Sequence, residues 1–143
     1  MTTVAQILKS KPDKTVHTVA PTATVFDALK LMAAKNIGAV VVADGSRIAG
    51  LLTERDYARK VVLLQKSSKD IPVSEIMTAQ VKSIGPERTS EECLAVMTEN
   101  RFRHLPVLEG GKLVGLVSIG DLVKDVISEQ KFQIEQLQNY VAG

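Results

Sequence analysis

Two hydroxyl–carboxylate pairs in this chain have a spacing that suits either a helix cap or a ligand site. The segments 50–56 (GLLTERD) and 115–121 (GLVSIGD) share a glycine, two apolar residues, a hydroxyl and, three residues later, an aspartate. Each pattern predicts the end of a buried strand that runs into a helix. The hydroxyl would cap the helix, and the acid would favour its positive end. The same groups could also bind a ligand, whose phosphate would meet free backbone N–H groups and whose sugar diol would meet the acid.

The second segment belongs to an internal repeat that is displaced by 65 residues. Glycines, prolines, apolar residues and the acid stay in step across both copies. The matched pairs include Val16 and Val81, Pro21 and Pro86, Thr24 and Thr89, Leu29 and Leu94, Met32 and Met97, Val42 and Val107, Gly45 and Gly110, and Asp56 and Asp121. Such a duplication indicates a repeated structural unit.

Local patterns predict a β-α-β-β-α order in each repeat, and therefore a mixed α/β (α+β) fold. Thr3 and Gln6 predict a capping box before a short helix, and Thr24 and Asp27 predict the start of a second helix. Further predicted elements of the first repeat are an extended segment at 16–19, strands at 39–43 and 48–52 joined by a turn, and a helix at 54–64. Residues 73–77 repeat the pattern of the first helix.

Each repeat of about 60 residues is too short to bury much of its own surface. We therefore expect the two repeats to pack sheet against sheet with pseudo-twofold symmetry. The predicted divisions are repeat 1 at 1–64, a polar linker at 65–72, repeat 2 at 73–127 and a C-terminal helical extension at 128–143.

Composition narrows the class of protein. The chain of 143 residues has a formal net charge of +2, which gives it no strong attraction to nucleic acid. No apolar run approaches the roughly 20 residues that cross a membrane, and the N-terminus lacks the features of a signal peptide. Cys93, the single cysteine, excludes an intrachain disulfide and is expected in the core. These features predict a cytoplasmic protein that binds neither nucleic acid nor membrane.

Taken together, residues 4–127 resemble a pair of CBS domains, which form a Bateman module. The resemblance rests on the Val-x-x-Ile-Met start of the second repeat at 73–77, the Pro-x-x-Thr helix starts, the Leu105-Pro106-Val107 strand and the two Gly-h-h-Thr/Ser-x-x-Asp endings. The matching strand at 38–42 lacks the proline. The resemblance implies a non-catalytic regulatory protein that binds AMP, ADP or ATP, or else NAD or S-adenosylmethionine, in clefts between the repeats, with no metal required.

The resemblance assigns a primary cleft around Asp56. Asp56 would accept hydrogen bonds from the ribose hydroxyls, Thr53 would meet the phosphate, and Arg103 of the other repeat would pair with that phosphate as a fork of donors. A solvated corner for Arg103 and an ordinary half-buried histidine for His104 are the structural alternatives. The full predicted set is Val16, His17, Ile37, Gly38, Ala39, Thr53, Arg55, Asp56, Arg103 and His104.

A second cleft would lie around Asp121. Its predicted residues are Val81, Lys82, Ser118, Gly120 and Asp121. Gly120 replaces Arg55, and the cross-repeat partner at 38–39 brings no charge. We therefore expect the Asp56 cleft to favour the phosphorylated ligand, while the Asp121 cleft stays empty or holds an adenosine moiety.

The residues after Asp121 predict one long helix with apolar residues at alternating spacings of four and three. The seam is formed by Val123, Ile127, Gln130, Ile134, Leu137 and Val141. It could pack on its own repeat, but its last residues extend beyond the repeat. We therefore expect a homodimer in which a partner chain covers them.

The sequence is compatible with three classes of function. A nucleotide sensor that regulates an unidentified protein is favoured, and the alternative is a dimerisation or interaction module with vestigial pockets. A small enzyme is disfavoured, because no nucleophile lies in a recognisable pairing with a base and the two histidines show no metal-ligand spacing.

Overall fold

The computed structural model describes residues 2–12 and 15–142, which divide into two compact units. Unit 1 comprises Met1–Lys14, Ser83–Gly110 and Val114–Gly143, and unit 2 comprises Thr15–Lys82 and Gly111–Leu113. The units therefore differ from the sequence repeats at their beginnings. The first helix of the chain belongs with the strands and helices of the second repeat, and the segment that starts the second repeat belongs with those of the first.

Unit 2 contains a three-stranded sheet in the order β1-β2-β3. Its elements are β1 (Thr18–Val19), α2 (Val25–Lys35), β2 (Ala39–Asp44), β3 (Arg47–Thr53), α3 (Glu54–Tyr57), the π-helical turn η1 (Ala58–Val62) and the 3-10 turn η2 (Val73–Glu75). Strand β1 runs parallel to β2, and β2 runs antiparallel to β3. Gly45, with φ +63°, allows the tight turn between β2 and β3.

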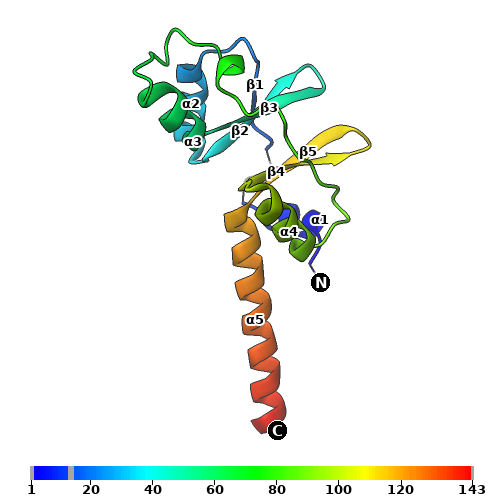
Figure 1. Cartoon of the computed structure of the whole chain (residues 1–143). Helices are drawn as coiled ribbons and strands as arrows, with labels where there is room; N and C mark the ends of the chain where they lie inside the picture. The colour runs from blue at the N-terminus through cyan, green and yellow to red at the C-terminus, as the bar shows by residue number, and fades with distance from the viewer. Residues whose placement is uncertain (1, 13–14, 143) are drawn as a thin grey trace. The chain divides into compact units, whose positions relative to one another are not determined.

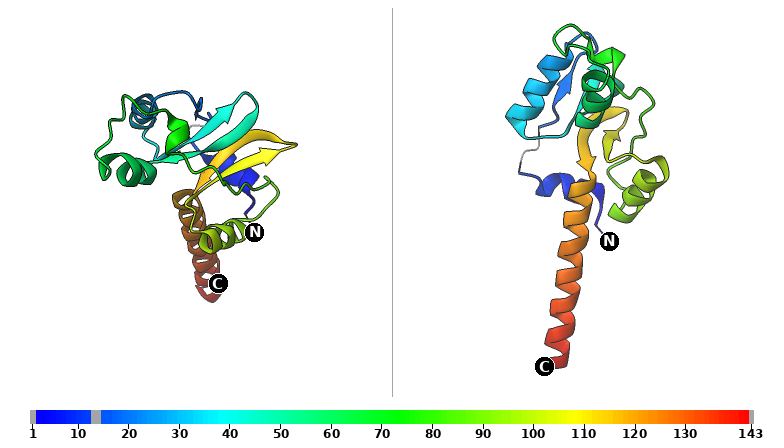
Figure 2. Two further views of the ribbon diagram at one scale, coloured as in Figure 1. Left: turned by 45° about the horizontal axis from the view of Figure 1, so that its top comes forward. Right: turned by 60° about the vertical axis from the view of Figure 1, so that its left-hand side comes forward.

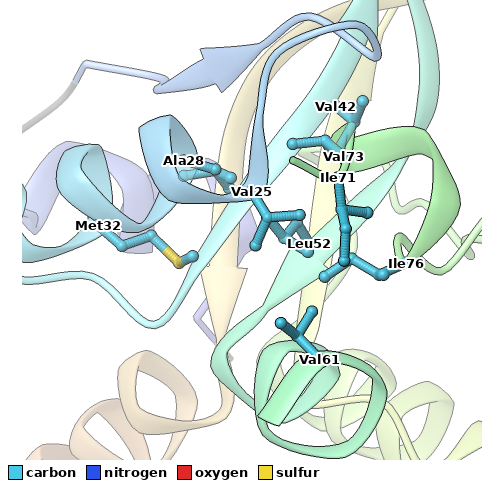
Figure 3. Packing of buried hydrophobic residues seen from close by; sticks show 10 residues of the cluster. Val25, Ala28, Met32, Val42, Leu52, Val61, Ile71, Val73 and Ile76 are labelled. Carbon is cyan, nitrogen blue, oxygen red and sulfur yellow. The ribbon is translucent and has the colours of Figure 1, made fainter. Parts of the chain in front are cut away.

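An aliphatic core joins α2 to the sheet of unit 2 (Figure 3). The α2 residues Val25, Ala28 and Met32 are buried, as are Leu52 of β3 and Val61 of η1. The segment that opens the second repeat completes this core with buried Val73 and Ile76. The Val-x-x-Ile-Met pattern is therefore explained by packing, because its apolar positions fill the space beneath the first repeat's sheet.

Unit 1 is built on the same plan with fewer strands. Its elements are α1 (Val4–Ser10), α4 (Ser90–Asn100), β4 (His104–Glu109), β5 (Lys112–Ser118), whose first two residues are grouped with unit 2, and α5 (Ile119–Ala142). Strands β4 and β5 form a two-stranded sheet, and the leading strand of the repeat is reduced to one parallel bridge between Ile84 and Val107. Val4 and Ile7 of α1 pack in one core with Cys93, which confirms the predicted burial of the cysteine.

The predicted fold class is confirmed, with three local corrections. A bridge at Ile84 replaces the expected leading strand of the second repeat, and a 3-10 turn replaces the helix expected at 73–77. The helix expected at 54–64 begins as α3 and continues as the π-helical turn η1. The predicted capping box of Thr3 with Gln6 and the side-chain cap at Thr24 are confirmed.

Two glycines at matching positions of the repeats meet different neighbours. A Cβ on Gly50 in β3 would lie 2.6 Å from the carbonyl oxygen of Thr78, which is backbone. A Cβ on Gly115 in β5 would instead lie 2.7 Å from the Cδ atoms of Leu8, which end a flexible side chain. Gly50 is therefore required by a close approach of main chain, whereas the space beside Gly115 is adjustable.

Helix α5 continues far beyond its contacts with α1 and α4 of the same unit (Figures 1 and 2). Its first turns bury Leu122, while residues 130–142 are all exposed. Among the described residues, no helix has the combination of length and apolar character that a membrane crossing requires. The long predicted tail helix is therefore confirmed, and its residues 130–142 are exposed on the structure described.

Candidate functional site

In unit 2, Thr53 and Asp56 form the predicted capping box at the start of α3. The Asp56 N–H donates to Thr53 Oγ1 at 3.0 Å, and the Thr53 N–H donates to Asp56 Oδ2 at 3.1 Å. Lys60 Nζ lies 3.2 Å from Asp56 Oδ1, and the Thr78 hydroxyl lies 3.4 Å from the same oxygen. Asp56 is only 8% exposed, so its charge is stabilised by these donors rather than by water.

The start of β2 lies directly beside this helix end. The Glu54 N–H donates to the Gly38 carbonyl at 3.1 Å, and Ala39 is the register partner of Thr53. The parallel strand β1 begins at the same end of the sheet, and Val16 and His17 lead into it. Within unit 2, the sheet topology therefore brings the predicted backbone contacts and the hydroxyl–carboxylate pair to one end of the sheet.

In unit 1, Ser118 and Asp121 form the same capping arrangement at the start of α5. The Ser118 N–H donates to Asp121 Oδ2 at 2.9 Å, and the Asp121 N–H donates to Ser118 Oγ at 3.1 Å. The cation here comes from the C-cap residue of α1, because Lys11 Nζ lies 3.1 Å from Asp121 Oδ2 and donates to the Leu116 carbonyl at 3.0 Å. Asp121 is thus held by a residue 110 positions away in the chain.

Arg103 and His104 lie beside the Asp121 end of α5. The Ile119 N–H donates to the Arg103 carbonyl at 2.8 Å, which places the start of β4 against the start of the helix. His104 is half-buried, while Arg103 is exposed. Burial lowers the pKa of His104, Asp121 opposes that shift, and Lys11 and Arg103 reinforce it.

The two acid ends differ in how their carboxylates are occupied. Asp56 uses both oxygens, and its side chain is 11% exposed. Asp121 uses Oδ2 twice, its side chain is 23% exposed, and Oδ1 accepts no hydrogen bond from the residues that the structure describes. The Asp121 carboxylate is therefore the more accessible acceptor.

The predicted residues fall into two separate groups. Unit 2 holds Val16, His17, Ile37, Gly38, Ala39, Thr53, Arg55, Asp56, Val81 and Lys82, and unit 1 holds Arg103, His104, Ser118, Gly120 and Asp121. Arg55 and Gly120 are both exposed, one residue before their aspartates. The assignment of Arg103 to Asp56, and of Val81 and Lys82 to Asp121, stays a prediction from the resemblance.

Sequence reasoning missed the two lysines. Lys60 could have been found from its spacing, since a cation four residues after an acid faces it on a helix. Lys11 could not, because no local pattern links it to Asp121. One signal was available: Asp125 occupies the position that matches Lys60, so the second acid needs a cation from elsewhere. Asp125 Oδ2 is buried without a hydrogen-bond partner among the described residues.

The cysteine and the metal-binding residue types form no reactive centre among the described residues. Burial raises the pKa of the Cys93 thiol to about 11, which makes it a poor nucleophile. Among residues 2–12 and 15–142, no group of three or more His, Cys, Asp and Glu side chains could hold a metal ion. The chemistry on view is therefore that of two helix ends with a hydroxyl, a buried or half-buried carboxylate and a lysine.

Comparison with known proteins now gives this arrangement a family. The sequence profile of the CBS domain matches residues 4–63 and 73–128. A protein with CBS domains from Burkholderia ambifaria has a solved structure that is 62% identical over 90% of this chain and 96% of its own, with a TM-score of 0.86. The CBS domain-containing protein CBSX3, mitochondrial, of Arabidopsis thaliana is 37% identical over 99% of this chain and 73% of its own length.

More distant matches show that the same unit occurs in other assemblies. A hexameric CBS-CP12 protein from bloom-forming cyanobacteria is 29% identical over 85% of this chain and 66% of its own, with a TM-score of 0.77. The chain covers only 22% of the length of two longer Arabidopsis relatives. Because the family profile matches both halves of the internal repeat, the chain belongs to the CBS-domain family and carries two copies of the domain.

Proposed function

We propose that this tandem CBS protein is a sensor that binds an adenine nucleotide at its acid-bearing helix ends and changes its affinity for a regulated protein. Tandem CBS proteins are generally regulatory modules. The observation that carries the proposal is the duplicated helix end, in which a hydroxyl and an oriented carboxylate lie together on the first turn of a helix. AMP, ADP and ATP are the proposed ligands, with NAD or S-adenosylmethionine as the next candidates.

The chemistry of each part of a nucleotide suits these groups. A carboxylate accepts hydrogen bonds from both hydroxyls of a ribose, and it has about four acceptor sites to do so. A phosphate is attracted to a helix N-terminus by the backbone N–H groups and the helix dipole. Lys60 and Lys11 would then exchange their aspartates for the phosphate, a step made easier by the 44% exposure of the Lys60 side chain.

The two ends differ as candidate first sites. The resemblance favours Asp56, which would be served by Arg103. The contacts within each unit favour Asp121. A ribose hydroxyl could reach Asp121 Oδ1, which accepts no hydrogen bond from the described residues, whereas at Asp56 it would have to displace Thr78 or Lys60. Variants of the two acids, described in the Discussion, distinguish the alternatives.

The competing function is an interaction module with vestigial pockets. The specific observation in its favour is that the capping box and a lysine already occupy Asp56. We nevertheless favour the sensor, since capping alone does not need an aspartate that is 8% exposed. We further propose a cytoplasmic homodimer whose regulated partner is another protein, in keeping with the assembly of the hexameric CBS-CP12 neighbour.

Thermal melting with and without ligand tests the sensor. A ligand that binds only the native state adds about 2.7 kcal/mol of stability at a hundredfold excess over its dissociation constant. AMP, ATP or NAD should therefore raise the melting temperature, and GMP and CMP serve as matched controls. Equal melting temperatures in all five nucleotides and in buffer would leave only the interaction module.

A further inference from the structure

The exposed part of α5 is not expected to be a stable helix by itself. The Thr2 hydroxyl donates to Glu129 Oε1 at 2.6 Å, and this is the last side-chain hydrogen bond between α5 and the rest of unit 1 among the described residues. Residues 130–142 beyond it are all exposed. A helix of about this length is marginal in water when nothing packs against it. Something that buries one of its faces is therefore needed to keep it folded.

The face that needs covering is well defined. Val123 and Ile127 are 46% and 49% exposed beside the body of the unit, and Ile134, Leu137 and Val141 are 54%, 65% and 85% exposed beyond it. With about 100° of rotation per residue, all of these side chains and Gln130 lie within one stripe, roughly a quarter turn away from buried Leu122. The stripe is continuous from the unit to the end of the helix.

The spacing of this stripe selects a helical partner. The intervals alternate between four and three residues, which is the heptad pattern of two helices that wind around each other. Its a positions are Ile127, Ile134 and Val141, and its d positions are Val123, Gln130 and Leu137. All three a positions are β-branched and one d position, Leu137, is leucine; in a parallel coiled coil, β-branched residues at a with leucine at d favour two strands.

The flanks of the stripe argue for a second copy in parallel. Lys124 and Lys131 lie at e positions, and Val126 and Gln133 lie at the g positions. A parallel pair places Lys131 beside Val126 of the partner helix, so no like charges meet. A fully overlapped antiparallel pair places Lys131 opposite its own copy, which is unfavourable. In a parallel, in-register pair the two Gln130 side chains face each other and can form a hydrogen bond. A polar residue of this kind in the seam specifies the register of the pair.

Other occupants fit the same surface less well. An anionic membrane surface would be met by a basic face, but residues 124–135 contain two lysines and three acids. The chain itself offers no further helix with a matching seam among its described elements. We infer that two copies of this chain pair through α5 as a parallel, in-register two-stranded coiled coil. This inference rests on the homodimer proposed above and specifies its surface and orientation.

Disulfide cross-linking of the full chain tests the orientation. The native cysteine is first replaced as Cys93→Ala, because alanine occupies the matching core position, Ala28, of the first repeat. Single cysteines are then introduced as Gln130→Cys, Leu137→Cys and Ser128→Cys. Two cysteines can bridge only when their Cα atoms lie within about 7 Å. A parallel pair brings both position 130 and position 137 together with their own copies, whereas Ser128 lies on the opposite side of the helix.

The expected result is a cross-linked dimer from Gln130→Cys and from Leu137→Cys, at more than about five times the yield from Ser128→Cys. A cross-link at only one of the two seam positions, which an antiparallel pair allows, overturns the inference. Equal yields from all three variants also overturn it. Melting of each reduced variant establishes that it is folded before oxidation.

Sedimentation provides a second readout that does not depend on cysteine. The unmodified protein should have at least twice the chain mass of 15.5 kDa, and Leu137→Asp should lower that mass, while Phe132→Asp, outside the stripe, should not. An unmodified protein that sediments at 15.5 kDa contradicts the inference. A nucleotide-dependent melting shift in a protein that fails both tests would retain the sensor and reject only this pairing.

Discussion

Replacement of Asp56 tests whether the carboxylate is a structural cap with the strength that its contacts suggest. Asp56→Ala removes the acceptor for the Thr53 N–H, which lies at 3.1 Å, and the partner of Lys60 at 3.2 Å. A hydrogen bond to a charged group contributes about 1.5–3 kcal/mol. The Lys60 pair adds at most a few tenths of a kcal/mol, because the lysine is 44% exposed and therefore screened by solvent.

We therefore expect Asp56→Ala to lower the free energy of unfolding by about 2 kcal/mol. For a chain of this size that corresponds to a fall in melting temperature of about 8 °C. Asp56→Asn is the matched control, since its amide oxygen can still accept from the Thr53 N–H. Its expected loss is less than half of the alanine variant's.

Denaturant unfolding followed by circular dichroism measures both variants on one scale. An unchanged dependence on denaturant would show that the same surface is exposed in each case. The cap as the origin of the stability loss is refuted if Asp56→Asn is as unstable as Asp56→Ala. A change below about 0.5 kcal/mol for Asp56→Ala would refute it as well.

Three further predictions concern Gly50, His104 and Cys93, and each follows from the surroundings of the residue. Gly50→Ala should lower the melting temperature at least twice as far as Gly115→Ala, since overpacking against main chain costs more than against a rotatable side chain; melting of both variants checks this. Because the pKa of His104 is lowered in the folded state, the unfolded state binds more protons below about pH 6.5. The free energy of unfolding should therefore decrease as the pH is lowered through this range, by at most about 1.4 kcal/mol per pH unit. This decrease should be smaller in His104→Asn. Cys93, with a pKa of about 11 and a buried thiol, should react with a thiol reagent only as fast as the protein opens; a native rate equal to that of the urea-unfolded chain would contradict its burial.

Features set by neighbouring residues were predictable from the sequence. The capping boxes at Thr3, Thr53 and Ser118 follow from a hydroxyl and an acid or amide three residues apart, and the structure confirms each hydrogen-bonded pair. The long tail helix follows from its unbroken periodicity. The 65-residue repeat predicted two similar halves, and their common plan of a helix, a β-hairpin and a further helix is confirmed.

Features set by long-range contacts were not predictable. Lys11 reaches Asp121 only because α1 packs in the unit of the second repeat, and no local pattern reveals that exchange. The leading strand of the second repeat is reduced to the bridge at Ile84, although Val81 matches Val16 in sequence. Strand length there depends on how many backbone groups find partners, whereas the sequence pattern reports only which side chains are apolar.

Calorimetric titration with AMP tests the sensor most directly. The wild-type protein should give a saturable heat with AMP and none with GMP. Asp56→Asn or Asp121→Asn should weaken AMP binding by at least about tenfold, because each ribose hydrogen bond to a charged acceptor is worth about 1.5–3 kcal/mol. The variant with the larger loss identifies the primary site. Absence of saturable heat with AMP, ATP, NAD and S-adenosylmethionine, or unchanged AMP affinity in both folded variants, would contradict nucleotide binding at these helix ends.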